Sequence, residues 1–340
     1  MKKQLAFVAL VALSVAVAAA GAYAKPERKS ATTLKGAGST FVMPLVSKWK
    51  EAYKNANIEY SGIGSGGGIN AITNRLVDFG ASDAPLTGDQ FSAAKGVVQV
   101  PWALSATSIP YNLPGVKKFL RLQGPTLAKI YLGKVKYWDD KQIKKVNKGV
   151  KLPHTKIVPV FRSDASGTSY NFTDYLTKVS PEFKRKVGKG TQPNFPTGTG
   201  AAKSSGVAGV LSRTEGAITY VDMAYSIKNG FKVASIQNKA GEFHAPGLAT
   251  IRAAASTIKK VRKDNAISIV APPKTNRRAY PICTFTWVIV ATKSKKASDL
   301  KQFISWAITK GQAFGPKLDF VPLPKIVLKA DQATLKKVHS

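Results

Sequence analysis

The chain has 340 residues, of which 44% are hydrophobic, and this is enough for one large or two medium domains with hydrophobic cores. It has 52 Lys and Arg residues against 18 Asp and Glu residues, so its formal net charge of +34 makes anions plausible partners. The single cysteine, Cys283, excludes an intramolecular disulfide, and no long apolar run after the N-terminal segment predicts a membrane helix.

The first 24 residues are typical of a cleaved signal peptide. Lys2 and Lys3 precede an apolar run from Leu5 to Ala20, and Ala22-Tyr23-Ala24 has the form of a cleavage site. A membrane anchor is the alternative, but the apolar run is short and rich in alanine, and no cysteine for lipid attachment follows it closely. We therefore expect an exported, soluble protein that resides in the periplasm.

Short β-type runs alternate with helical patterns along the rest of the chain. We expect strands at residues 57–63, 77–81, 157–161, 217–221 and 287–291, and helices at 45–53, 69–76, from 88 onward, and at 170–179. This alternation predicts an α/β architecture with largely parallel sheets. Residues 193–206 are typical of a loop, and the Pro-rich segments 102–114 and 272–281 are candidate crossings between two domains.

Four Gly-rich and Ser-rich loops each follow an expected strand and open a helical run. They are Gly36-Ala37-Gly38-Ser39-Thr40-Phe41, Gly62-Ile63-Gly64-Ser65-Gly66-Gly67-Gly68, Gly80-Ala81-Ser82-Asp83-Ala84-Pro85-Leu86 and Arg162-Ser163-Asp164-Ala165-Ser166-Gly167-Thr168-Ser169. Ligands of open α/β sheets bind at such positions. Helix N-termini, small hydroxyls and an arginine together indicate a tetrahedral oxyanion as the ligand.

Each loop also has a simpler interpretation. A Gly-rich turn before a helix is often only a helix cap, and Asp83 could be the N-cap of the helix that follows it. Arg162 and Asp164 could form a surface ion pair that contributes little. The Gly-rich loop at 62–68 is neither a phosphate-binding loop of nucleotide hydrolases nor a convincing dinucleotide fingerprint. Four such loops in one chain nevertheless favour an anion site.

The segments GAGSTF, YSGIGSGGGINAI, DFGASDAPLT, IYLGKVKYWDD, FRSDASGTSYNFTDYL and GAITYVDMAYS resemble those of the periplasmic phosphate-binding proteins of phosphate ABC importers. The likeness runs from about Leu34 into the C-terminal region and keeps the order and spacing of the motifs. It departs from the family at Ser39, where alanine is frequent, and at residues 188–209, which are shorter and less similar.

The resemblance implies a two-lobed periplasmic-binding-protein fold of type II, with the anion in the cleft between the lobes. We expect lobe 1 at residues 25–103 plus 283–340 and lobe 2 at residues 104–282. By the same resemblance, the phosphate contacts are Ser39, Thr40, Phe41, Ser65, Asp83, Arg162, Ser166, Gly167 and Thr168. We expect Asp164 to orient Arg162 and to offset part of its charge.

Asp83 is unusual in an anion site because a carboxylate repels an anion. It can instead accept a hydrogen bond from the proton that phosphate, unlike sulfate, retains near neutral pH. An unpaired buried polar group can support discrimination of roughly ten-thousand-fold. We therefore expect selectivity for phosphate to depend on Asp83.

The sequence predicts no enzyme, cofactor or metal site. His154, His244 and His339 are scattered without metal-ligand spacing, and no base accompanies Ser166. The expected partners are inorganic phosphate and the membrane permease of an ABC importer, with the protein as a monomer and no nucleic acid. Two alternatives stay open: an exported phosphoester-processing enzyme, and a basic surface protein that binds polyanions or nucleic acid through charge.

Overall fold

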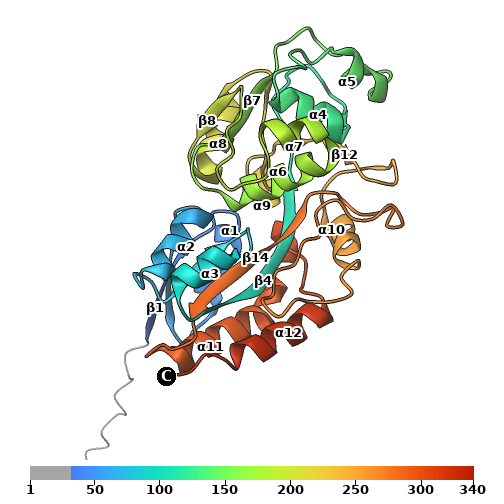
Figure 1. Cartoon of the computed structure of the whole chain (residues 1–340). Coiled ribbons are helices and arrows are strands. Elements are labelled where there is room, and N and C mark those ends of the chain that lie inside the picture. The colour runs from blue at the N-terminus through green and yellow to red at the C-terminus, as the bar shows by residue number, and fades with distance from the viewer. Residues whose placement is uncertain (1–31) are drawn as a thin grey trace, which may run out of the picture. The chain divides into compact units, whose positions relative to one another are not determined.

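The structure is a computed structural model that describes residues 32–340, so the predicted signal peptide at residues 1–24 lies outside the described residues. The strands of the described part form a six-stranded, a five-stranded and a three-stranded sheet (Figure 1). Within residues 32–340, no helix combines the length and apolar character needed to cross a bilayer.

The six-stranded sheet has the order β10-β4-β14-β3-β1-β2. Its strands are β1 (Thr33–Gly38), β2 (Asn57–Gly62), β3 (Phe79–Ser82), β4 (Val97–Ser108), β10 (Val221–Asp222) and β14 (Cys283–Ala291). β1 runs parallel to β2 and β3, whereas β14 is antiparallel to both β3 and β4. The expectation of largely parallel sheets is therefore wrong here. β4 carries the chain toward the second lobe and β14 brings it back beside β4, so the two strands run in opposite directions.

The second lobe contains the two smaller sheets. The five-stranded sheet has the order β11-β5-β9-β7-β8, and the three-stranded sheet has the order β13-β12-β6. Their strands are β5 (Pro110–Tyr111), β6 (Arg121–Leu122), β7 (Val158–Arg162), β8 (Thr199–Ala201), β9 (Ala217–Ile218), β11 (Lys232–Val233), β12 (Ser235–Gln237) and β13 (Phe243–His244). β7 lies parallel to both β8 and β9, so its carboxyl end opens the Arg162 loop.

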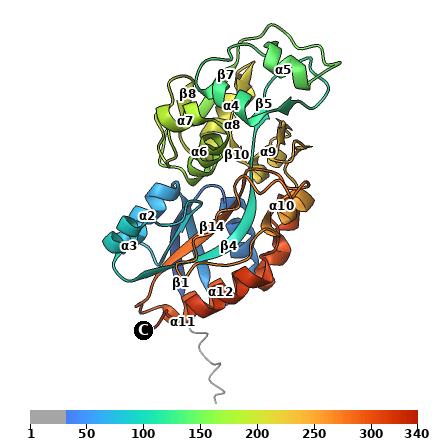
Figure 2. The ribbon, with the colours of Figure 1, turned by 45° about the vertical axis from the view of Figure 1, so that its right-hand side comes forward.

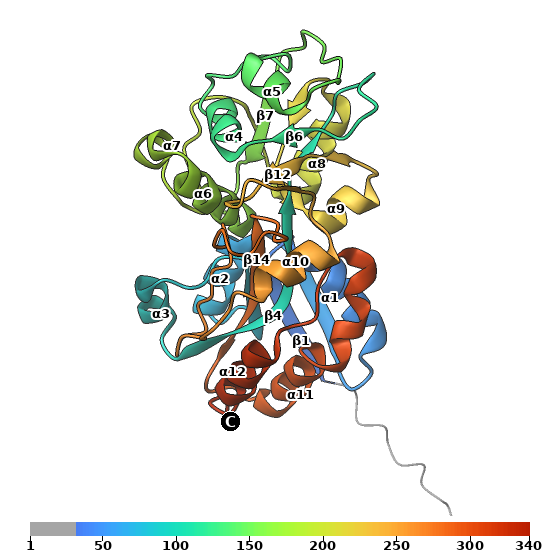
Figure 3. The same cartoon turned by 90° about the vertical axis from the view of Figure 1, so that its right-hand side faces the viewer.

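Helices cover both lobes. Figures 2 and 3 show α11 and α12 against the six-stranded sheet and α4 to α8 in the other lobe. The helices are α1 (Met43–Ala52), α2 (Ser65–Thr73), α3 (Gly88–Ala94), α4 (Gly124–Tyr131), α5 (Lys141–Val146), α6 (Gly167–Val179), α7 (Pro181–Lys186), α8 (Lys203–Arg213), α9 (Met223–Lys228), α10 (Leu248–Ala255), α11 (Ala297–Ala307) and α12 (Lys325–Leu335), with short 3-10 helices at Lys310–Phe314 and Pro316–Leu318. Aromatic clusters fill both cores, with Trp49 against Trp102 in the first and Tyr131 against Phe172 in the second.

The Pro-rich segment 102–114 contains the passage from one sheet to the other. β4 extends to Ser108 in the six-stranded sheet, and β5 begins at Pro110 in the five-stranded sheet. Pro101 lies where the pairing of β4 with β14 shifts its register, a position at which a strand tolerates proline. The lobe boundaries themselves stay a prediction, and β10, from within residues 104–282, joins the six-stranded sheet.

One expected strand and one expected loop differ in kind from the structure. The expected strand at 217–221 is divided between β9 and β10, which belong to different sheets. Residues 193–206, expected as a loop, contain β8 and the first turn of α8. β8 is three residues long and pairs only with β7 within the described sheets, so its composition carries little strand signal.

Candidate anion-binding site

Four segments meet between the lobes. Three follow β1, β2 and β3, whose carboxyl ends share one edge of the sheet, and the fourth follows β7 in the other lobe. The amide of Gly66 donates to the carbonyl of Ala165 at 2.9 Å, and Arg162 Nη1 donates to Thr40 Oγ1 at 3.3 Å. All nine predicted phosphate contacts are buried. The structure thus brings the four predicted loops together, while the assignment of their residues to phosphate stays a prediction.

The carboxylate of Asp83 accepts hydrogen bonds from three hydroxyl groups. Its Oδ1 accepts from Ser39 Oγ at 2.5 Å and from Thr286 Oγ1 at 2.7 Å, and its Oδ2 accepts from Ser65 Oγ at 3.4 Å. Burial raises the pKa of Asp83 to about 6, against the lowering effect of these hydrogen bonds and of the charge on Arg162. The carboxyl group therefore titrates close to the range in which phosphate loses its second proton.

Asp83 does not cap the helix that follows it, so that interpretation is wrong. Thr87 is the N-cap of α3, and it forms a capping box with Gln90. The side chain of Asp83 turns instead toward Ser39 and Thr286. Its carboxylate therefore belongs to the buried polar contacts between β3, β1 and β14.

Arg162 is buried and held by Asp164, so the surface ion pair considered from the sequence is also wrong. The arginine side chain is only 2% exposed, and its Nε donates to Asp164 Oδ1 at 2.7 Å while Nη2 donates to Oδ2. Burial would raise the pKa of Asp164, but the hydrogen bonds and charge of Arg162 outweigh it and hold that pKa below the usual value. This bidentate pair fixes the guanidinium plane and leaves Nη1 directed at Thr40.

The start of α6 supplies donors from the second lobe. Ser166 is its N-cap and accepts from the amide of Ser169 at 3.2 Å, and Gly167 and Thr168 form the first turn. The first amides of a helix have no intrahelical partner. Among residues 32–340 the buried hydroxyl of Thr168 also has no hydrogen-bond partner. A buried hydroxyl without a partner is costly, so this one is a strong candidate to bond a ligand.

Gly167 allows the two lobes to approach closely. A Cβ atom at this position would lie 2.6 Å from Ser65 Oγ and 2.8 Å from the backbone nitrogen of Asp83. Only glycine lets the first turn of α6 lie so close to the loop that follows β3. Asn171, one turn further along α6, donates to the carbonyl of Asp83 at 2.7 Å.

Sequence reasoning missed several polar residues of this site. Thr286 on β14 reaches Asp83, and Ser204 on α8 lies 2.8 Å from Thr40 Oγ1. Asp222, the N-cap of α9, is also buried, and burial followed by the charge of Asp83 holds its pKa well above the usual value. These residues lie in no Gly-rich loop, and sheet pairing across more than two hundred residues brings Thr286 to Asp83.

Comparisons with known proteins agree with this architecture. A family profile described as a PBP superfamily domain matches residues 24–310. The phosphate-binding protein PstS of Xylella fastidiosa (strain 9a5c) is 38% identical over 314 residues, which are 90% of this chain and 86% of the relative. PstS of Pasteurella multocida (strain Pm70) is 36% identical and covers 90% of each chain. The chain belongs to the PstS family of phosphate-binding proteins.

The family assignment extends to the fold. The crystal structure of a phosphate-binding protein from Stenotrophomonas maltophilia matches with a TM-score of 0.74 over 89% of this chain and 94% of that chain, at 18% sequence identity. The two-lobed binding-protein fold expected from the sequence is therefore confirmed. The four loops described above lie where the two lobes meet.

Proposed function

We propose that this protein is an exported solute-binding protein that captures inorganic phosphate between its lobes and delivers it, as a periplasmic monomer, to the permease of an ABC importer. The observation that carries the proposal is Asp83, a buried carboxyl surrounded by hydroxyl donors and facing a buried arginine. The relatives are named for binding phosphate and not for a reaction, which favours a binding protein over a phosphoester-processing enzyme.

The predicted contacts would hold phosphate mainly through uncharged donors. Hydroxyls come from Thr40, Ser65 and Thr168, and backbone amides come from the first turn of α6. Arg162 adds one cation, but Asp164 offsets part of its charge through the bidentate pair. Affinity would therefore depend on matching each phosphate oxygen to a donor in a site shielded from water rather than on net charge.

Discrimination against sulfate would fall to Asp83. Its Oδ1 already accepts from Ser39 and Thr286, whereas among residues 32–340 its Oδ2 accepts only the long bond from Ser65. This leaves a lone pair for the P–OH group of phosphate. Sulfate has no proton to donate near neutral pH, so its oxygen would face an ionised carboxylate across a buried contact.

Calorimetric titration of the purified protein with phosphate and then with sulfate tests the proposal. We expect saturable binding of phosphate with a stoichiometry of one and no measurable binding of sulfate. D83N should weaken phosphate binding and reduce the preference over sulfate by a factor of roughly a hundred or more. D89N, which removes an exposed carboxylate from α3, is the matched control and should change neither. Absence of heat with phosphate would overturn the function, and unchanged selectivity in D83N would overturn the role of Asp83.

Binding of polyanions through surface charge is the second candidate, because the net charge of +34 favours it. The two functions respond differently to salt. Phosphate held in a buried site should lose little affinity as salt is raised, whereas binding of a nucleic acid should weaken steeply. Repeating the phosphate titration and a DNA titration at two salt concentrations separates them.

A further inference from the structure

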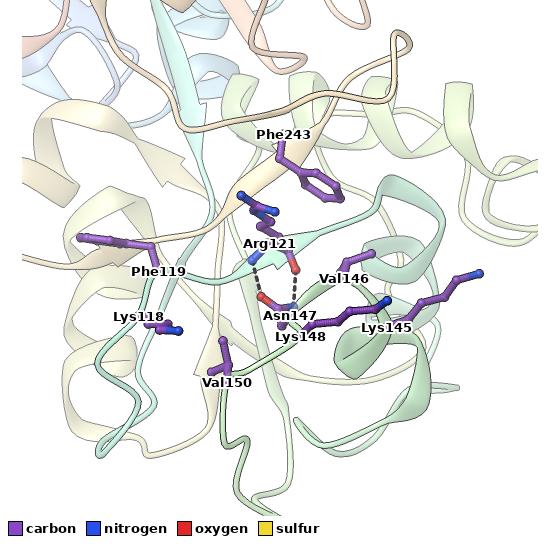
Figure 4. A pocket seen from close by; sticks show the side chains of 9 residues that line it. All are labelled: Lys118, Phe119, Arg121, Lys145, Val146, Asn147, Lys148, Val150 and Phe243. Atoms are coloured by element: carbon purple, nitrogen blue, oxygen red, sulfur yellow. Dashed lines mark hydrogen bonds between the residues drawn. The ribbon is translucent and has the colours of Figure 1, made fainter.

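A cavity of about 500 Å³ lies in the lobe that carries the two smaller sheets (Figure 4). It is formed by the segment around β6, the end of α5 and β13, none of which contributes a residue to the site between the lobes. Its lining residues are Lys118, Phe119, Arg121, Lys145, Val146, Asn147, Lys148, Val150 and Phe243. The volume is in the range of pockets that bind small organic molecules.

Four cationic side chains line this cavity without a carboxylate among its lining residues. Figure 4 shows Lys118 to one side of Arg121, and Lys145 and Lys148 to the other. Acids that are near in sequence have partners elsewhere: Asp139 pairs with Lys144 and His154, and Glu242 pairs with Arg277. Four like charges around a concave surface repel one another, and an anion with several charges would relieve that repulsion.

The cavity around Arg121 has more cationic side chains than another cavity of the molecule. The cavity of about 220 Å³ beside α6 and β14 has Arg262 as the single cationic side chain among its lining residues. Because the chain as a whole is basic, matched lysine variants are needed to separate the cavity around Arg121 from the general surface charge.

Two phenylalanine residues line the cavity, and Figure 4 shows Phe119 at its edge with the ring directed away from Arg121. The guanidinium of Arg121 lies over the ring of Phe243, 5.6 Å from its centroid. Phe119 is 69% exposed, which is unusual for a large apolar side chain beside a charged pocket. A ligand that stacks on Phe119 would cover this exposed ring.

The base of the cavity is held in place by Asn147. Its Oδ1 accepts from the amide of Arg121 at 2.8 Å, and its Nδ2 donates to the carbonyl of Arg121 at 2.8 Å and to that of Ile143 at 2.9 Å. The buried amide thus joins the end of α5 to β6 (Figure 4). Asn147 therefore connects the elements that carry Arg121 and Lys145, whereas Lys118 and Lys148 lie in the segments next to these elements.

We propose that this cavity binds an organic polyphosphate, in which two or more phosphate groups contact Lys118, Arg121, Lys145 and Lys148 and an attached flat group stacks on Phe119. Nucleoside triphosphates are the simplest members of this class. Lysine ammonium groups and an arginine guanidinium are the usual partners of phosphate oxygens, and aromatic rings are the usual partners of nucleobases.

The test is a calorimetric titration of the purified protein with ATP in the absence of divalent cations, with inorganic phosphate in excess over the protein so that the site between the lobes is filled. Inorganic tripolyphosphate and adenosine are titrated separately. We expect one saturable ATP site, tripolyphosphate binding at least fivefold weaker, and no detectable binding of adenosine. Equal affinities for ATP and tripolyphosphate would overturn the role of the aromatic surface and with it the organic ligand.

Three variants distinguish the cavity from general surface charge. K145A/K148A should weaken ATP binding at least tenfold, whereas K259A/K260A, which removes the same charge from an exposed pair outside the cavity, should change it less than twofold. F119A should weaken ATP binding and leave tripolyphosphate binding unchanged. An unchanged titration of K145A/K148A with inorganic phosphate shows that this variant is folded. Equal losses in the two lysine variants, or no saturable ATP binding to the unmodified protein, would overturn the proposal.

Discussion

At the scale of single residues, the hydroxyl of Thr168 should lower the stability of the unliganded protein and strengthen the binding of phosphate. Its hydroxyl is buried and has no hydrogen-bond partner among residues 32–340. T168V replaces the hydroxyl with a methyl group of similar size, so we expect the unliganded protein to become more stable by about 1–2 kcal/mol. The same change should weaken phosphate binding about tenfold, because one donor is lost. Urea unfolding and phosphate titration measure the two effects.

T168S is the matched control because it retains the hydroxyl. We expect it to bind phosphate with an affinity within a few-fold of the unmodified protein and to gain no stability from removal of the polar group. Loss of stability in T168V together with unchanged phosphate affinity would show that this hydroxyl serves the fold and not the ligand.

Arg162 tests whether geometry or charge matters more in the site. R162K keeps the positive charge but removes the planar guanidinium, which donates hydrogen bonds to both carboxylate oxygens of Asp164. We expect phosphate binding to weaken by a factor of roughly 30 to 300, equivalent to about 2–3 kcal/mol. R252K, on α10 and at an exposed position, is the control and should bind phosphate normally. An affinity in R162K within twofold of the unmodified protein would contradict a geometric role.

At the scale of elements, the residue types in the sequence predicted the four loops, but in the structure part of the loop at 62–68 is helical. The glycines at 66–68 were expected as a loop before a helix at 69–76, whereas α2 already begins at Ser65. A Cβ atom on Gly68 would lie 2.4 Å from the Cα atom of Gly38 and 2.7 Å from the carbonyl oxygen of Ala37. Gly68 therefore lets α2 pack backbone to backbone against β1, which only the three-dimensional structure shows.

This packing leads to a prediction about the glycines. G68A should destabilise the protein by roughly 3 kcal/mol or more, because backbone atoms on three sides would have to move. G88A is the matched control: nothing lies within 4 Å of a Cβ at this first residue of α3, so we expect a change within about 1 kcal/mol, toward higher stability. Urea unfolding of both variants measures the difference, and similar stabilities would contradict the close packing of α2 on β1.

At the scale of the whole molecule, the sequence indicated that the four loops meet at one site. It did not reveal every residue that joins them there. The loop residues were predictable because four loops of the same chemistry occur in one chain, although each loop alone could be only a helix cap. Thr286 was not, because it lies inside a buried strand whose sequence is typical of any core strand. Its position beside Asp83 follows from the antiparallel pairing of β14 with β3, in which Trp287 lies opposite Ser82. Pairing between strands that are distant in the sequence cannot be predicted from the residue pattern of either strand alone.

Three buried carboxyl groups predict how the stability of the unliganded protein depends on pH. Burial raises the pKa of Asp83 to about 6 and that of Asp331, on α12, to about 9, and burial also raises the pKa of Asp222. Between the ordinary Asp pKa of about 4 and these values, the folded protein binds more protons than the unfolded chain. The free energy of unfolding should therefore decrease as pH rises from about 5 to 8.

Other carboxyl groups act in the opposite direction below that range. Hydrogen bonds from Lys134 and Lys186 lower the pKa of Glu182 to about 2, and the pKa of Asp164 is also below its usual value. These groups stabilise the folded protein when ionised, and their contribution is lost as pH falls from about 4 toward 2. Together the two sets predict maximum stability near pH 4–5, at a salt concentration high enough to screen the surface charge.

D331N isolates the contribution of one of these buried carboxyl groups. Both carboxyl oxygens of Asp331 are buried and lack a hydrogen-bond partner within the described residues 32–340, so ionisation there is strongly opposed. Removing the titrating group should raise the free energy of unfolding at pH 8, leave it nearly unchanged at pH 4, and so flatten the decrease between them. Guanidinium unfolding without phosphate, from pH 3 to pH 9 at constant salt, measures both curves, with D89N as the exposed control. A stability that climbs steadily from pH 5 to 8, or an equal effect of D331N at pH 4 and pH 8, would contradict the assignment of this pH dependence to buried carboxyl groups.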